Sequence, residues 1–162
     1  EGEAYGFETD ITWSISDDLT AVGGMTLLHT EFGDFNTSDA FGLPTNRAGD
    51  PFLYSPEEVF NLTLVYDRPL NDTLGVSAVL NGRWQSDSTA GIPSDSAFDI
   101  DSYGILNGSI GLYSLNDSWE FSIWGKNLTD EYYWNQVVGN ANVNVRFAGK
   151  PRTFGASLNY RF

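Results

Sequence analysis

Hydrophobic and polar side chains alternate along most of this chain, and the last ten residues show the pattern most clearly. Phe154, Ala156, Leu158, Tyr160 and Phe162 fall on one side of an extended strand, whereas the residues between them are polar or glycine. Because successive side chains of a β-strand point to opposite faces, this pattern predicts one apolar and one polar face. Seven strands are predicted in this way, at residues 3–16, 19–35, 57–68, 73–85, 102–114, 118–127 and 152–162.

The connections between these strands are of two kinds, which alternate along the chain. Short segments rich in Asp and Asn, residues that favour tight turns, lie at 16–18, 69–72 and 115–117. Long polar loops lie at 33–56, 86–101 and 128–151. The order predicts an all-β fold of seven long antiparallel strands, with all the tight turns at one end and all the long loops at the other.

Charged residues inside the predicted strands fall almost entirely on the polar face. Those on the polar face are Glu8, Asp10, Asp67, Arg83, Glu120, Lys126 and Arg161. Arg68 is on the apolar register, but at a strand end, where its long side chain could reach polar surroundings. A charge on the lipid-facing side of a membrane barrel costs about 2–4 kcal/mol at the bilayer midplane, so segregation of this kind is expected there. Aromatic residues also gather near the strand ends, as in the interfacial girdles of membrane barrels. The pattern therefore favours a transmembrane β-barrel, with its tight turns in the periplasm and its long loops outside the cell.

Three short motifs near the end of the chain resemble the C-terminal part of TonB-dependent outer-membrane receptors. The first is Asn127-Leu128-x-Asp130-x-x-Tyr133, the second is Gly149-x-Pro151-Arg152-x-Phe154-Gly155, and the third is the closing Tyr160-x-Phe162. The resemblance is close over residues 119–162 and looser over the rest. Asn127, Asp130 and the segment from Gly149 to Arg152 are interpreted as structural, because Asn and Asp shape turns by bonding nearby backbone N–H groups.

The resemblance implies a transport function. A receptor of this family would bind a scarce nutrient at its outer loops and import it with energy supplied through TonB. The typical cargo is a ferric siderophore, with cobalamin, haem or oligosaccharides as variants. Tyr132 and Trp134, in the last long loop, are the candidate ligand-facing residues because their rings could stack on a ligand. The resemblance also implies that the outer-membrane assembly machinery recognises the closing strand. The apolar row of that strand contains Phe154, Leu158, Tyr160 and Phe162.

Seven strands are too few for a bacterial membrane barrel of one chain, which has an even number from eight upward. Residues 1–162 are therefore expected to be the C-terminal segment of a larger barrel, which alone would be an open curved sheet. The plug domain, the segment that contacts TonB and the remaining strands are expected upstream of Glu1. The expected location is the outer membrane of a Gram-negative bacterium, in contact with lipid and lipopolysaccharide.

Composition excludes several other functions. The formal net charge is −14 with only eight Lys and Arg residues, so a nucleic-acid partner is not expected. The chain has no cysteine, and His29 is its only histidine. No catalytic constellation emerges, and we expect neither an enzyme nor a cofactor. A cluster of loop acids could hold divalent cations near lipopolysaccharide, the residues being Asp87, Asp95, Asp99 and Asp101.

Two alternatives remain open. A passive porin-like or structural barrel would need no plug and no energy source. A soluble β-sandwich would also alternate along its strands, but it would not usually combine strands this long with two distinct classes of connection.

Overall fold

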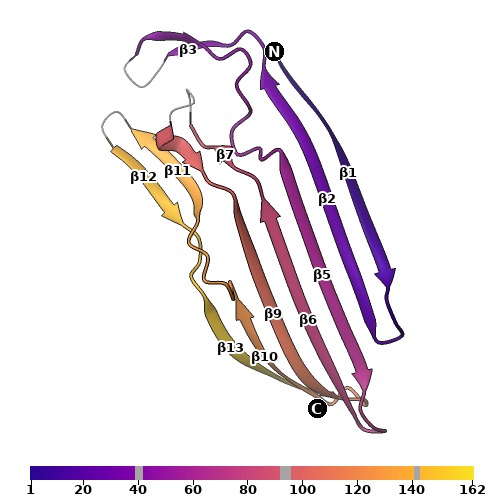
Figure 1. Cartoon of the computed structure of the whole chain (residues 1–162). Coiled ribbons are helices and arrows are strands. Elements are labelled where there is room, and N and C mark those ends of the chain that lie inside the picture. The colour runs from indigo at the N-terminus through magenta and orange to yellow at the C-terminus, as the bar shows by residue number, and fades with distance from the viewer. Residues whose placement is uncertain (39–41, 92–95, 141–142) are drawn as a thin grey trace.

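The computed structural model describes residues 1–38, 42–91, 96–140 and 143–162. Its main feature is a seven-stranded antiparallel sheet in which each strand pairs with its neighbours along the chain (Figure 1). The strands, in spatial order, are β1 (Gly2–Ser14), β2 (Leu19–Phe32), β5 (Glu58–Pro69), β6 (Leu74–Gln85), β9 (Tyr103–Ser114), β10 (Trp119–Lys126) and β13 (Thr153–Tyr160). The predicted all-β fold is confirmed, and the predicted strand ends differ by at most three residues.

The tight turns form where they were predicted, all at one end of the sheet (Figure 1). The first is closed by the amide of Ile15, which donates to the carbonyl of Leu19 at 2.9 Å. The third is closed by the amide of Asp117, which donates to the carbonyl of Ser114 at 2.9 Å, with Asp117 at a φ of +58°. Asp tolerates this left-handed conformation better than most residues, which explains its use in a turn this short.

The long loops contain secondary structure that the sequence pattern did not predict. Each holds a two-stranded sheet of its own. Their strands are β3 (Asn36–Ser38) with β4 (Pro44–Asn46), β7 (Ser88–Thr89) with β8 (Asp99–Ile100), and β11 (Trp134–Asn140) with β12 (Val143–Ala148). A single turn of 3-10 helix, η1 (Ser96–Phe98), precedes β8. Among the described residues, no helix is long and apolar enough to span a membrane.

The register of the sheet places the predicted faces on opposite sides. Leu64 lies opposite Leu80, and Leu80 opposite Gly108, whereas Asn81 lies between Thr63 and Asn107 on the other face. On that polar face, hydrogen bonds run from Asn81 Nδ2 to Thr63 Oγ1 at 2.9 Å and from Asn107 Nδ2 to Asn81 Oδ1 at 3.4 Å. The sheet thus has an apolar face and a hydrogen-bonded polar face, as expected for the wall between lipid and an aqueous lumen.

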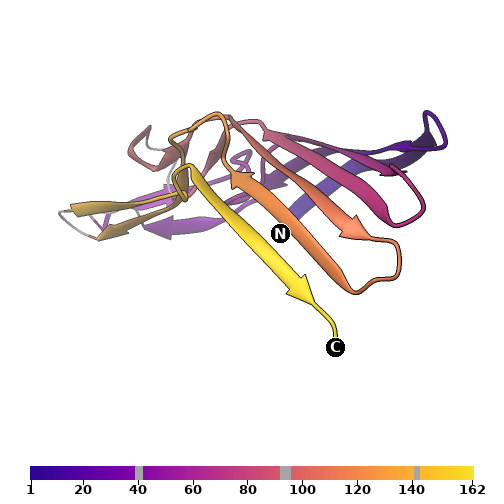
Figure 2. The ribbon, with the colours of Figure 1, turned by 90° about the horizontal axis from the view of Figure 1, so that it is seen from below.

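The sheet is a single curved layer that does not close on itself (Figure 2). Its edges are β1 and β13, each paired with only one other strand of this sheet. Among the described residues, only Ile100 and Val137 are buried hydrophobic residues, and both lie in the long loops rather than in the sheet. The apolar face therefore has no protein layer over it.

This geometry leads to an expectation for the isolated 162-residue chain. It should aggregate in water or require detergent, because one broad apolar face and two strand edges are uncovered. Light scattering after expression without detergent provides the measurement. A monodisperse soluble monomer would contradict the assignment of the apolar face to lipid.

Candidate functional site

The three long loops contact one another at the end of the sheet opposite the tight turns. The hydroxyl of Tyr54 in the first loop donates to the carbonyl of Val137 in the third at 3.1 Å, and the amide of Tyr54 donates to the carbonyl of Thr89 in the second at 2.8 Å. Arg146 Nη2 in the third loop donates to the carbonyl of Ala97 in the second at 3.1 Å. The three long loops therefore form one connected assembly, which we call the loop assembly.

The third loop presents an aromatic and cationic group to solvent. The exposed ring of Tyr132 meets Trp134 edge-on, with ring centroids 5.1 Å apart. The guanidinium carbon of Arg146 lies 5.4 Å from the centroid of Trp134. These contacts bring together the two candidate ligand-facing residues and add Arg146, which sequence reasoning missed. Rings with an adjacent cation can stack on a flat ligand and attract negative charge.

Tyr133 has a different environment from that of Tyr132 and Trp134. Its ring stacks on Tyr103 of β9 with centroids 4.3 Å apart. It also covers Gly149, where any side chain would collide with the ring. Gly149 and Tyr133, which belong to separate motifs in the sequence, are therefore brought together as one packing unit between the start and the end of the third loop.

Asn127 joins the same two ends of the loop through hydrogen bonds. It is buried and has a φ of +51°. Its Nδ2 donates to the carbonyls of Glu131 at 2.8 Å and Lys150 at 3.1 Å, and its Oδ1 accepts the amide of Glu131 at 2.9 Å. Asparagine suits this position because it tolerates the left-handed conformation and carries both a donor and an acceptor.

Asp130 and Arg152 form a second link across the base of the loop. Asp130 has a φ of +57° and accepts the backbone amide of Arg152 at 3.2 Å. Their side chains form an ion pair with Nη2 and Oδ2 3.2 Å apart. Both side chains are about half exposed, so the ion pair itself contributes little. The hydrogen bond fixes the entry into β13 just after Pro151, which is exposed.

Leu128 secures the loop on the apolar side of the sheet. Its amide donates to the carbonyl of Leu106 at 2.8 Å. Its side chain, together with Phe154, covers Gly125, where a larger residue would collide with both. The described contacts of these motif residues thus attach the third loop to the sheet. The assignment of these residues as purely structural remains a proposal.

Arg47, in the first loop, was not singled out from the sequence. Its side chain is fully buried, with Nε 2.8 Å from Asp50 Oδ2 and the guanidinium carbon 5.4 Å from the centroid of Phe32. Within the described residues, its two terminal nitrogens have no hydrogen-bond partner. The i, i+3 spacing of Arg47 and Asp50 is visible in the sequence, but the burial of Arg47 depends on how the loop folds back on β2.

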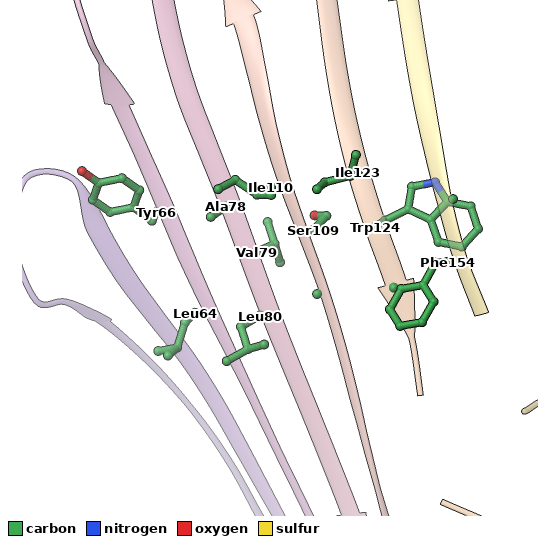
Figure 3. Close-up of a pocket in the computed structure, with 13 residues that line it drawn as sticks. Leu64, Tyr66, Ala78, Val79, Leu80, Ser109, Ile110, Ile123, Trp124 and Phe154 are labelled. Carbon is green, nitrogen blue, oxygen red and sulfur yellow. The ribbon is translucent and has the colours of Figure 1, made fainter. Parts of the chain in front are cut away.

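An apolar hollow of about 740 Å³ lies in the wall, on the apolar face of the sheet (Figure 3). Gly108 and Gly125, which lie opposite each other on β9 and β10, leave it without side chains there. Leu80, Ile110 and Phe154 surround this gap. With so few polar groups, the hollow suits hydrocarbon rather than a charged solute, and we treat it as part of the lipid-facing surface.

The closing strand carries its apolar row on the same face. Phe154, Leu158, Tyr160 and Phe162 are all exposed, and the rings of Tyr160 and Phe162 meet edge-on with centroids 5.1 Å apart. Phe154, Leu158 and Tyr160 lie on β13, an edge strand of the seven-stranded sheet that pairs only with β10, and Phe162 follows two residues after its end. The part that this row plays in recognition by the assembly machinery stays a prediction.

A charge in that row tests the prediction. In the full-length protein, Phe162→Asp should lower the fraction of heat-modifiable barrel in outer-membrane preparations far more than Asn159→Asp, which changes the polar face of the same strand. An unchanged folded fraction for Phe162→Asp would contradict a role of this aromatic residue in assembly.

The proposed cation cluster in the second loop finds no support. Asp95 lies outside the described residues. Among the residues that are described, no group of three or more His, Cys, Asp or Glu side chains is arranged to hold a metal ion.

Comparison with known proteins assigns most of the chain to a family. Residues 1–128 match the family described as TonB dependent receptor-like, beta-barrel. The chain is 27 % identical over 161 residues to the ferric-pyoverdine receptor PbuA of Pseudomonas sp. (strain M114). The aligned region is 98 % of this chain but only 18 % of PbuA.

Two solved structures show the same fold. The ferric yersiniabactin uptake receptor FyuA from Yersinia pestis superimposes with a TM-score of 0.80 at 16 % identity, covering 99 % of this chain and 24 % of that one. The ferric-catecholate import receptor Fiu from E. coli, in its closed form, superimposes with a TM-score of 0.73 at 23 % identity. That match covers 99 % of this chain and 21 % of Fiu. Receptors of this family are outer-membrane proteins of Gram-negative bacteria and are transport receptors rather than enzymes. The match over residues 1–128, together with the open seven-stranded sheet, shows that this chain belongs to the TonB-dependent receptor family and forms part of its β-barrel.

Proposed function

We propose that the full-length protein is an outer-membrane receptor that binds a ferric siderophore at its outer loops and imports it with energy supplied through TonB. The observation that carries this proposal is the family match over residues 1–128. It is supported by the alignment of nearly the whole chain with a receptor named for ferric pyoverdine. Because this chain spans less than a quarter of each compared protein, the substrate is proposed only as a class.

In this proposal the chain has two tasks. The sheet supplies barrel wall, with its apolar face toward lipid and the Thr63–Asn81–Asn107 ladder toward the lumen. The loop assembly supplies part of the ligand-facing surface, where Tyr132, Trp134 and Arg146 contact the siderophore. The hydrogen bonds of Asn127 and Asp130 hold that surface on the wall.

The remaining partners follow from the same proposal. The plug domain, the segment that contacts TonB and the other strands would lie upstream of Glu1, with residues 1–162 as the C-terminal segment of the barrel. Phospholipid and lipopolysaccharide would cover the apolar face, and the outer-membrane assembly machinery would insert the barrel.

Uptake measurements test the transport function. The full-length protein is expressed in a Gram-negative host that lacks its own siderophore receptors, and cells are supplied with radioactive iron in a panel of hydroxamate, catecholate and mixed siderophores. We expect at least one complex to be bound and accumulated, and accumulation to stop in an otherwise identical host without TonB while binding persists.

The competing function is a passive pore. It would give accumulation that is unaffected by loss of TonB and ion conductance in planar bilayers without an energy source. If the folded protein binds none of the complexes in the panel, the proposed substrate class is wrong.

A further inference from the structure

The hairpin of β11 and β12 in the third loop has two faces with different surroundings. One face packs on the other loops. There Val137 is buried and its carbonyl accepts the Tyr54 hydroxyl, Arg146 donates to Ala97, and the Phe98 ring covers Gly139 so closely that a side chain would collide with it. This face already has its partners within the chain.

The opposite face is exposed and mainly apolar, with Gln136, directly opposite Phe147, as an exposed polar residue on it. Val143, Val145 and Phe147 alternate along β12 and are 61 %, 47 % and 50 % exposed, and Val138, directly opposite Val145 on β11, is 44 % exposed. In addition, β12 pairs only with β11, so the backbone groups along its other edge have no strand partner among the described residues. An apolar face beside a free strand edge is the surface that an added extended segment would cover.

The position of the hairpin indicates where such a segment would come from. Residues 149–152 connect β12 directly to β13, and both strands lie along the same side of the structure (Figure 1). β13 is itself an edge strand with one side unpaired in the seven-stranded sheet. In a closed barrel another strand must pair with that side, and its outward continuation would then run beside β12.

We propose that the bare face and free edge of the β11–β12 hairpin dock an extended outer-loop segment of the same polypeptide, from a part outside residues 1–162. The segment continues the strand that pairs with β13. This inference rests on membership of the barrel family and not on the transported substrate. The lengths of the relatives support this proposal. Residues 1–162 cover only 18 % of PbuA and 24 % of FyuA, so proteins of this kind contain other segments that could supply the docked one. An extended segment with apolar side chains fits this face better than a polar iron complex does, because four of its side chains offer no hydrogen-bond donor or acceptor and Gln136 lies at one end, opposite Phe147.

Thiol labelling on intact cells tests the docking. Because residues 1–162 contain no cysteine, single cysteines can be placed in the full-length protein after any others are replaced by serine. Val145→Cys should react with a water-soluble maleimide roughly tenfold or more slowly than Asn135→Cys, an exposed position on the same hairpin, because a thiol under a packed segment reacts only when that segment opens. Equal rates in folded, heat-modifiable protein would overturn the proposal. Protection that appears only when a siderophore is added would overturn it too, since the occupant would then be the ligand.

Photo-crosslinking identifies the occupant independently. A photoreactive phenylalanine analogue in place of Phe147 should give a product without added protein mass, whose crosslinked peptides come from the polypeptide outside residues 1–162. The same analogue in place of exposed Tyr132 should not reach those peptides. Crosslinks from position 147 only to a separate protein, to a second copy or to lipid would contradict the inference.

Discussion

Leu80→Arg and Ile110→Arg should each destabilise the folded full-length barrel by about 2–4 kcal/mol, and the double variant should lose nearly all folded protein. Leu80 and Ile110 lie near the centre of the apolar face, where they are 41 % and 52 % exposed with no protein over them. Leu80 is opposite Leu64, and Ile110 is opposite Ala78. An arginine at either position has a long way to reach water, so its charge would remain in hydrocarbon.

Ser77→Arg is the matched control, because Ser77 is on the polar face of the same strand as Leu80 and directly opposite Asp67. Asn107 also lies on the polar face, but it is a poor control since its Oδ1 accepts the amide of Asn127 at 3.0 Å. Folded yield in outer-membrane preparations and urea unfolding in lipid vesicles provide the two readouts. If Ser77→Arg costs as much as Leu80→Arg, the assignment of the two faces is wrong.

Asn127→Ala should release the base of the third loop. The change removes three hydrogen bonds, leaves the amide of Glu131 and the carbonyls of Glu131 and Lys150 without their partner, and puts alanine at a φ of +51°. Unsatisfied buried groups and the left-handed backbone together should cost about 2–4 kcal/mol of local stability. Hydrogen exchange and proteolysis of residues 128–151 in the full-length protein should both become faster, whereas exchange in β6 should change little.

Two further variants separate the causes. Asn127→Gly tolerates the backbone conformation but still loses the hydrogen bonds, so it should behave nearly as badly as Asn127→Ala. Asn159→Ala, which removes one exposed hydrogen bond to Glu120, should have little effect. Normal protection of the third loop in Asn127→Gly would mean that the side-chain bonds do not hold the loop.

The strands, their faces and the tight turns could be predicted because each depends on local pattern. Alternation with period two places Leu80 and Ser77 on opposite faces whatever the rest of the chain does. Asp and Asn at 16–18 and 115–117 mark turns by their own conformational preference. The internal hairpins of the long loops could not be predicted in the same way. They depend on contacts between distant residues, such as the bond from Tyr54 to Val137, 83 residues apart.

The candidate site was predictable only in part. The resemblance picked out Asn127, Asp130 and Arg152, but not the geometry that joins Asn127 to Lys150, 23 residues later. Tyr132 and Trp134 stand out in the sequence as aromatic residues of a long loop, but nothing local indicates that Arg146 lies against Trp134. Which loop side chains are covered depends on how the loops pack together, and alternation within one segment carries no information about that.

Cysteine scanning along β6 tests the central claim, that this sheet is membrane-spanning barrel wall. Single cysteines at positions 76 to 81 of the full-length protein in its membrane would carry a fluorophore, quenched in turn by a lipid-bound and by a water-soluble quencher. We expect strict alternation, with Val76, Ala78 and Leu80 quenched from the lipid and Ser77, Val79 and Asn81 unaffected by the lipid-bound quencher. Efficient quenching from water at all six positions, or no alternation, would contradict the account.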